Sequence, residues 1–485
     1  MSLTSSDSLS PSISITDSSL DLDSLDFPEP LSPLNTALEA IRKASEDLAK
    51  IDDPADSSAA FTAIDTAVDD FIDEVDSERS SYNEASFDRH SLEVQRLKAK
   101  KSDFQSLKET IAKVKQQFPG MGPKIDDLQK KIDTKQASLD ERIFEVTKSA
   151  FNRFYSVTLD SRPDLDPHLK SGQLSQELFF MTSDINAFVS DHTNELDPAL
   201  GKTLMQCMNQ LYFASPWDTA PATDETADEI LETIGNLEPG QSCVIPGGSK
   251  GHAFLYRVVR LSDDKLSVTI INTGEDESFF KAIQRVRILE SSWTRGLRGI
   301  RYTDKCYTVD MDKFDKAFIK AILPSANKTT STSDVLAKVD RMLLVQRNAV
   351  ATEGRVHAPQ LRGSCTAKCV TEWLKDELIR CHGHKGRVLY EKFQAYRTRH
   401  NIAAISTIQK HVDQEVLQKV YREPSPKKLD QRLKTMKREA EVVLERRTCR
   451  AEELATPKQP SDETYESPIP DYLQFYAYGA YGFAY

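Results

Sequence analysis

Apolar residues follow two different periods along the chain, and the period changes near residue 240. Within residues 35–215 they recur every three or four residues, which is typical of amphipathic helices. Within residues 253–272 aromatic and β-branched residues gather in two short runs, which favours β-strands. Helical spacing returns at about 310–323 and 332–347, and it dominates residues 365–452 apart from a break at two prolines. This order predicts an α+β fold with a mainly helical N-terminal half.

A heptad-spaced apolar stripe predicts a helical hairpin. Leu97, Phe104, Ile111 and Phe118 repeat every seven residues, and Leu107 and Val114 lie between them. The segment 119–123, Pro-Gly-Met-Gly-Pro, interrupts the helix and permits a reversal. The second arm then carries Ile125, Leu128, Ile132 and Leu139. We expect this stripe to pack inside the hairpin, and dimerisation is the alternative.

A β-hairpin is predicted over residues 253–272. The runs 253–261 and 266–272 flank the turn-like sequence Asp263-Asp-Lys265, and further strands are expected near 286–289 and 300–309. A hairpin brings its two ends side by side. His252, which follows the glycine-rich segment 246–251, would therefore lie within reach of Asn272 at the end of the second strand. In that position Asn272 would orient the imidazole.

Cys365 follows Gly363 and Ser364 and opens a strong helical pattern. Free N–H groups and the dipole at a helix N-terminus stabilise an anion, so we expect a thiol with a lowered pKa. Together with the amide of Gln360, the same N–H groups would stabilise an oxyanion. The sequence therefore predicts a cysteine nucleophile at Cys365, a base at His252, an orienting group at Asn272 and an oxyanion donor at Gln360.

The order of histidine, asparagine about twenty residues later, glutamine and cysteine resembles the circularly permuted papain-like clan of cysteine peptidases. This clan includes adenain, ubiquitin-like-protein peptidases and YopJ-type acetyltransferases, and the resemblance covers roughly residues 240–380. It implies an α+β papain-like cysteine-enzyme domain that cleaves an amide or isopeptide bond, with ubiquitin or ubiquitin-like conjugates as the protein substrate. An acyltransferase that works through a cysteine thioester is equally compatible, and no cofactor or metal is implied for a hydrolase.

Several alternatives stand beside the cysteine enzyme. A non-enzymatic adaptor would use the helical hairpin and the aromatic tail for binding and would leave Cys365 inert. Zinc is a further alternative, because thiolate and imidazole are its preferred ligands. The five residues of that ligand set are Cys365, Cys369, Cys381, His382 and His384. The chain has no Walker loop, GxGxxG or HExxH motif, so nucleotide binding and zincin chemistry gain no support.

Charge and composition differ between the two ends of the chain. Residues 1–34 are rich in Ser and Asp and lack Lys and Arg, which predicts disorder. They resemble the export signal of bacterial type III secretion substrates, and an inert tail is the alternative. Residues 380–450 hold eighteen Lys or Arg against eight Asp or Glu. This basic stretch is either a solvated helix face or a surface for an acidic partner, nucleic acid, an inositol phosphate or a membrane. The aromatic run 472–485 either docks on the protein itself or recognises another protein.

The chain as a whole reads as several soluble domains. At 485 residues it exceeds one ordinary core, and no run of about 18 apolar residues indicates a transmembrane helix. The N-terminus lacks the pattern of a Sec-type signal peptide. The seven cysteines are an odd number, and none occurs before Cys207, so reduced thiols and a cytosolic site of action, including a host cytosol, are expected. The predicted division is 1–34 disordered, 35–215 helical, 216–400 cysteine-enzyme domain, 401–455 basic helical region and 456–485 flexible tail.

Overall fold

The computed structural model describes residues 33–50, 57–77, 89–159, 173–273, 302–357 and 365–456. Within them the protein is mostly helical and contains one five-stranded antiparallel sheet, so the predicted α+β class is confirmed. The chain forms two compact units. The first comprises residues 1–80 and 106–129, and the second comprises 81–105 and 130–485. The five predicted domains stay predictions, because compactness does not test which parts fold independently.

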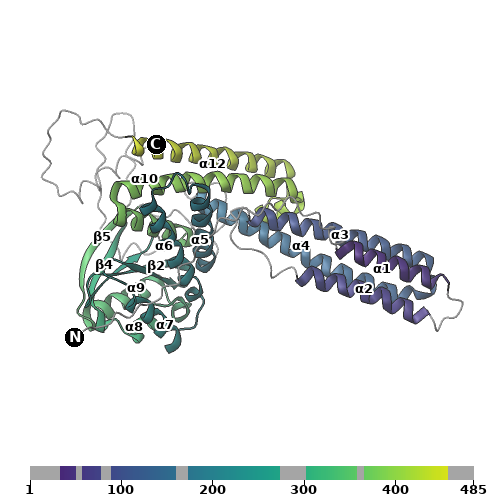
Figure 1. Ribbon diagram of the computed structural model, residues 1–485, viewed down its shortest axis with the longest axis horizontal. Coiled ribbons are helices and arrows are strands. Elements are labelled where there is room, and N and C mark those ends of the chain that lie inside the picture. The colour runs from purple at the N-terminus through teal and green to yellow at the C-terminus, as the bar shows by residue number, and fades with distance from the viewer. Residues whose placement is uncertain are drawn as a thin grey trace, which may run out of the picture. The chain divides into compact units, whose positions relative to one another are not determined.

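The first unit contains helices only among its described residues. They are α1 (Pro33–Leu48), α2 (Ser57–Ser77), the last part of α3 (Arg89–Gln117), the short η2 (Pro119–Met121) and the first part of α4 (Gly122–Thr158) (Figure 1). Its core is built from apolar residues at helical spacing, among them Ile41, Val68, Phe71, Leu107 and Ile111.

The predicted helical hairpin is confirmed, since α3 and α4 follow each other across the 119–123 turn. Ion pairs connect the two arms within each unit: Lys115 with Asp126 in the first, and Glu93 with Arg142 at 2.6 Å in the second. The apolar stripe is buried within the single chain, as expected for internal packing, although Phe118 is only half-buried.

Besides its parts of α3 and α4, the second unit has helices that lie against the sheet and helices that extend beyond it (Figure 1). They are α5 (Leu174–Asp191), α6 (Pro198–Ala214), α7 (Asp224–Gly235), α8 (Lys316–Ile322), α9 (Thr332–Arg341), α10 (Cys365–His411), α11 (Gln414–Tyr421) and α12 (Pro426–Ala455). Short helical turns are η3 (Pro216–Asp218), η4 (Met311–Lys313), η5 (Pro324–Asn327) and the π-helical η6 (Met342–Gln346). Among the described residues, none of the helices has the length and hydropathy needed to cross a bilayer.

The sheet is a simple meander in the order β1-β2-β3-β4-β5, with every pair antiparallel. Its strands are β1 (Ser242–Ser249), β2 (His252–Arg260), β3 (Lys265–Ile271), β4 (Tyr302–Asp310) and β5 (Val350–His357). The predicted hairpin is β2 and β3, and the strand expected at 300–309 is β4. The strand expected at 286–289 lies outside the described residues.

The sequence interpretation missed both edge strands. No strand was predicted for the glycine-rich segment 246–251, but its first four residues belong to β1, and the turn itself is at Lys250 and Gly251. Gly251 has a φ of 75°, which favours glycine. Pro246 is tolerated because an edge strand has one unpaired side and needs no N–H donor there. Proline and glycine therefore hid a strand that lies at the edge of the sheet.

Helix α10 bends sharply. Gly383 has a φ of 56° and a ψ of −126°, which interrupts the helical backbone, and Gly386 lies directly against the last turn of the first segment. After the bend, α10 runs beside α12 (Figure 1). The second segment packs with the end of α4, α11 and α12 around Phe151, Phe154 and Ile408. The sequence placed the helix ends near Pro424 and Pro426 correctly and missed the bend.

Candidate cysteine site

The N-terminus of α10 and the start of β2 carry the two reactive side chains of the candidate site. Cys365 is the first residue of α10, and His252 is the first residue of β2. Asn272 follows β3 directly. All three side chains are buried, with relative exposures of 7%, 5% and 3% respectively. Gln360, the predicted oxyanion donor, lies outside the described residues.

The hairpin aligns His252 with Asn272, as the sequence predicted. Leu255 pairs with Ile271 in the ladder, so the strand ends lie next to each other. His252 Nε2 is 2.7 Å from Asn272 Oδ1. Because an amide oxygen can only accept a hydrogen bond, Nε2 carries a hydrogen and donates a hydrogen bond to Asn272 Oδ1. This contact fixes the ring orientation and leaves Nδ1 to meet the Cys365 sulfur.

Cys365 has a thiol whose acidity is set by two opposing effects. Burial is the largest single effect and disfavours the thiolate, but the hydrogen bond and charge of His252, together with backbone hydrogen bonds, outweigh burial and hold the pKa below its ordinary value. The backbone N–H groups of Ala253 and Thr366 donate those hydrogen bonds to the sulfur. The Thr366 contribution agrees with the expected effect of a helix N-terminus. Ala253 was not anticipated, because a backbone donor leaves no signal in the sequence.

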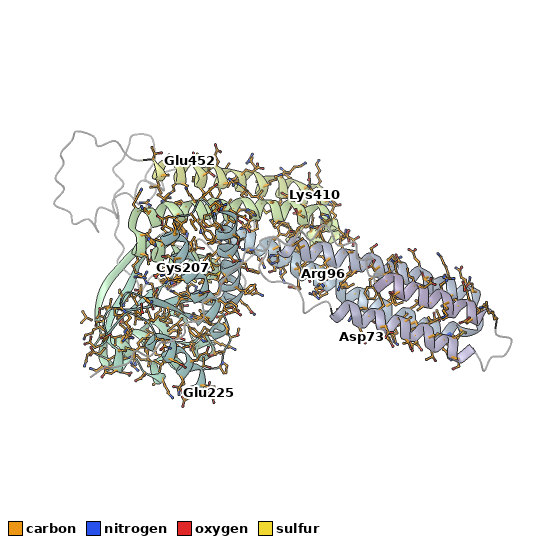
Figure 2. The ribbon with its side chains drawn as sticks, in the orientation of Figure 1. Asp73, Arg96, Cys207, Glu225, Lys410 and Glu452 are labelled. Carbon is orange, nitrogen blue, oxygen red and sulfur yellow. The ribbon has the colours of Figure 1, made fainter. Side chains whose placement is uncertain are left out.

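The other cysteines do not share this environment. All seven cysteines are free thiols. Cys369 lies one turn after Cys365, and burial raises the pKa of its thiol well above the ordinary value. Cys207 on α6 (Figure 2) and Cys243 on β1 are also buried, and burial raises the pKa of both thiols. Only Cys365 among these buried thiols combines a histidine neighbour with a lowered pKa.

The residues of the zinc alternative are engaged separately. His382 Nε2 is 2.7 Å from Thr203 Oγ1, and His384 Nε2 is 2.8 Å from the carbonyl oxygen of Leu454. Within the ranges that the structure describes, no group of three or more His, Cys, Asp or Glu side chains is arranged to hold a metal ion. The zinc reading therefore gains no support from these residues.

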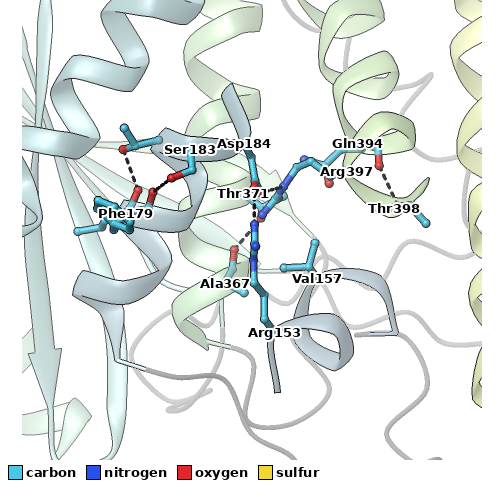
Figure 3. A network of polar contacts seen from close by, with 12 residues as sticks. Arg153, Val157, Phe179, Ser183, Asp184, Ala367, Thr371, Gln394, Arg397 and Thr398 are labelled. Carbon is cyan, nitrogen blue, oxygen red and sulfur yellow. Dashed lines mark hydrogen bonds and ion pairs between the residues drawn. The ribbon is translucent and has the colours of Figure 1, made fainter. Parts of the chain in front are cut away.

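A buried ion cluster lies beside the first turns of α10 (Figure 3). It consists of Arg153 from α4, Asp184 from α5, and Arg397 from the second segment of α10. Arg397 Nε donates to Asp184 Oδ2 at 2.6 Å, and Arg153 pairs with the other carboxylate oxygen. Figure 3 shows Ala367 and Thr371 of α10 next to this cluster. Directional contacts therefore connect α4, α5 and α10.

Glu177 on α5 belongs to the same electrostatic environment. Burial raises the pKa of its carboxyl to about 7, although the charges of Arg153 and Arg397 lower it and Asp184 raises it. Near neutral pH this buried acid is thus poised between its charged and neutral forms.

Comparison with protein-family models and with curated protein sequences finds no match to this chain. Its function must accordingly be argued from the site itself.

Proposed function

We propose that this protein is a cysteine-nucleophile hydrolase that cleaves an amide or isopeptide bond in a protein substrate, with ubiquitin or ubiquitin-like conjugates as the substrate class. The observation that carries the proposal is the connected set of side chains. Cys365 hydrogen-bonds His252, and His252 Nε2 contacts Asn272 Oδ1 at 2.7 Å. A nucleophile, a base and an orienting group in contact form the arrangement used for covalent acyl transfer. The fold expected for such an enzyme is the papain-like one.

The reaction begins with proton transfer from the Cys365 thiol to His252, which gives a thiolate and an imidazolium. The thiolate attacks the carbonyl carbon, and the oxygen takes the electron pair of the C=O double bond. Backbone N–H groups at the start of α10 and the predicted donor Gln360 would stabilise this oxyanion. His252 then gives its proton to the leaving amine as the C–N bond breaks, and a thioester remains on Cys365.

Hydrolysis completes the cycle. His252 takes a proton from water, and the resulting hydroxide attacks the thioester carbonyl. The C–S bond breaks, Cys365 leaves as a thiolate and the acid is released. The imidazolium of His252 returns its proton to that thiolate, so the pair is again a thiol and a neutral imidazole. Asn272 keeps the imidazole in the tautomer that presents Nδ1 to sulfur throughout. If a protein hydroxyl or amine replaces water, the same steps give an acyltransferase, which is the alternative reading.

The test compares wild type with Cys365→Ala and His252→Ala. Purified protein is incubated with ubiquitin-type electrophiles, with acetyl-CoA and with a general thiol probe, and adducts are mapped by mass spectrometry. The hydrolase proposal expects ubiquitin-type labelling at Cys365 that depends on His252. Acyl transfer from acetyl-CoA to Cys365 without ubiquitin-type labelling would select the acyltransferase. A Cys365 that reacts with neither substrate mimic nor thiol probe would favour the adaptor.

A further inference from the structure

The first segment of α10 is tied to the sheet at the end opposite the nucleophile. Ser242 Oγ, at the start of β1, donates to Glu377 Oε1 at 2.6 Å. Arg380 Nε donates to Glu377 Oε2 at 3.1 Å, and Arg380 Nη1 donates to the carbonyl oxygen of Gly240 at 2.8 Å. Glu377 is only 3% exposed. Burial opposes its ionisation, but Arg380 and Ser242 hold the pKa of the carboxyl below its usual value.

The contacts of Glu377 and the candidate site lie at opposite ends of the first segment of α10 and of β2. Glu377 is twelve residues after Cys365, which corresponds to about 18 Å along a helix. On the sheet, Ser249 pairs with His252 and Ser242 pairs with Val259. The seven residues from His252 to Val259 correspond to roughly 23 Å along a strand. The helix segment and β2 therefore run in the same direction, and a polar contact joins helix to sheet at each end.

A second polar contact supports the same alignment. Arg257 on β2 pairs with Asp376 on α10, with 4.0 Å between Nη1 and Oδ2. Between these residues and the site, α10 contributes apolar side chains such as Val370, Trp373 and Leu374 to the core that it shares with β2. Apolar contact is favourable but non-directional, so it restrains the rotation and axial position of a helix mainly through the shapes of the packed side chains. Hydrogen bonds to a buried carboxylate are directional and fix both.

We propose that Glu377 is a positioning residue that, through Ser242, sets the rotation and axial position of α10 on the sheet and so holds the Cys365 sulfur against His252. This inference rests on the proposed function only for what the positioning achieves. The contact between the Cys365 sulfur and the His252 imidazole exists whatever the substrate is. Glu377 does not touch the reacting atoms. It acts through the helix that begins at the nucleophile.

The test measures the reactivity of Cys365 without any substrate. Alkylation by iodoacetamide is followed from pH 5 to 10 by peptide-resolved mass spectrometry in wild type, Glu377→Ala, Glu377→Gln and Ser242→Ala. Glu377→Ala and Ser242→Ala are expected to slow alkylation of Cys365 near pH 6 by roughly tenfold, which corresponds to about one unit in the thiol pKa. Glu377→Gln keeps an amide oxygen for Ser242 Oγ and is expected to recover most of the rate. His252→Ala sets the lower limit of reactivity.

Tyr307→Phe is the matched control. It removes a 2.6 Å hydrogen bond between the Tyr307 hydroxyl on β4 and Asp340 on α9, away from α10. It is expected to lower stability to a similar extent and to leave the alkylation profile unchanged. A wild-type profile in folded Ser242→Ala overturns the positioning role, and this outcome is available even if Glu377→Ala does not fold. A shifted profile in a protein that no ubiquitin-type probe or acetyl-CoA labels would instead retain the positioning role and reject the proposed function.

Discussion

At the candidate site, the acidity of a side chain depends on the residues that it contacts. Burial by itself would make the Cys365 thiol a weak acid, as it does for Cys369 and Cys243. At Cys365 the contacts with His252 and two backbone N–H groups lower the pKa instead, and Asn272 contacts His252. The same residue type therefore has a lowered pKa at one position and a raised pKa one helical turn away.

Replacing His252 is expected to raise the thiol pKa of Cys365. In wild type the folded chain releases the thiol proton at lower pH than the unfolded chain does. The resulting stability is present above the ordinary pKa and is lost as pH falls through the lowered one. His252→Ala should therefore slow alkylation of Cys365 at pH 7 by at least about tenfold, and the difference from wild type should narrow as pH rises above the ordinary thiol pKa. Equal rates at pH 7 in the two proteins would contradict the contact between the side chains.

Glu177→Gln is expected to stabilise the protein at alkaline pH. The pKa of Glu177 is raised to about 7, so the fold favours its protonated form. That stability is fully present below the ordinary pKa of 4.5 and is lost as pH rises to 7. The glutamine stays neutral, so the free energy of unfolding should rise by about 1–3 kcal/mol at pH 8 and change little at pH 4. Urea unfolding at both pH values measures the difference, and a loss of stability at pH 8 would show that the carboxylate is needed.

At the scale of elements, the bend in α10 depends on close backbone contact. A Cβ at Gly386 would lie 1.9 Å from the carbonyl oxygen of Leu378, and backbone at this position cannot move aside without opening the bend. The bend lets one helix begin at the nucleophile and continue along α12. It thus links the site to the second core around Phe151 and Ile408.

Gly386→Ala should therefore destabilise the second unit by about 2–5 kcal/mol, within the range of severe backbone and packing changes. Gly235→Ala is the control, because a Cβ at Gly235 would meet nothing within 4 Å. Thermal or urea unfolding compares the two variants. A Gly386→Ala protein as stable as Gly235→Ala would mean that the bend opens at little cost.

Removing the buried carboxylate of the ion cluster is expected to cost more than removing a surface charge. In the wild-type protein, the buried Asp184 carboxylate contacts the guanidinium groups of both Arg153 and Arg397. Asp184→Asn removes this negative charge and leaves the two buried guanidinium groups without it. Loss of one partner from such a cluster costs about 3–5 kcal/mol. The exposed pair of Lys434 and Asp430 is the comparison, and Asp430→Asn should change stability by less than about 1 kcal/mol. If Asp184→Asn and Asp430→Asn lower the free energy of unfolding in urea equally, the ion cluster does not determine stability.

Local pattern was sufficient for some elements and insufficient for others. The β2–β3 hairpin and the contact of His252 with Asn272 could be predicted because a short turn fixes strand register over few residues. The approach of Cys365 to His252 was a hypothesis, since it depends on how α10 packs on the sheet. β1 and β5 were missed because edge strands tolerate Pro246 and Gly354. The bend at Gly383 was missed because an isolated glycine is compatible with a continuous helix.

At the scale of the whole molecule, the two compact units have separate cores. Ile111 is fully buried in the first unit, and the candidate site lies in the second. Ile111→Ala should destabilise the first unit by about 2–5 kcal/mol. The pH profile of Cys365 alkylation should stay at its wild-type value. Peptide-resolved hydrogen exchange reports the stability of each unit, and a parallel loss of protection in β2 and β3 would show that the units unfold together.

The order of the site residues along the chain has a consequence for biosynthesis. Asn272 is synthesised 93 residues before Cys365, and His252 is synthesised 113 residues before it. At 5 to 20 residues per second, the ribosome adds the shorter interval in roughly 5 to 20 seconds. β5, which completes the sheet, is also made shortly before α10. A nascent chain therefore carries the imidazole and its partner for seconds before Cys365 is made, and Cys365 follows only when all five strands of the sheet have been synthesised. Chain order alone thus delays formation of the Cys365–His252 contact until the whole sheet is available.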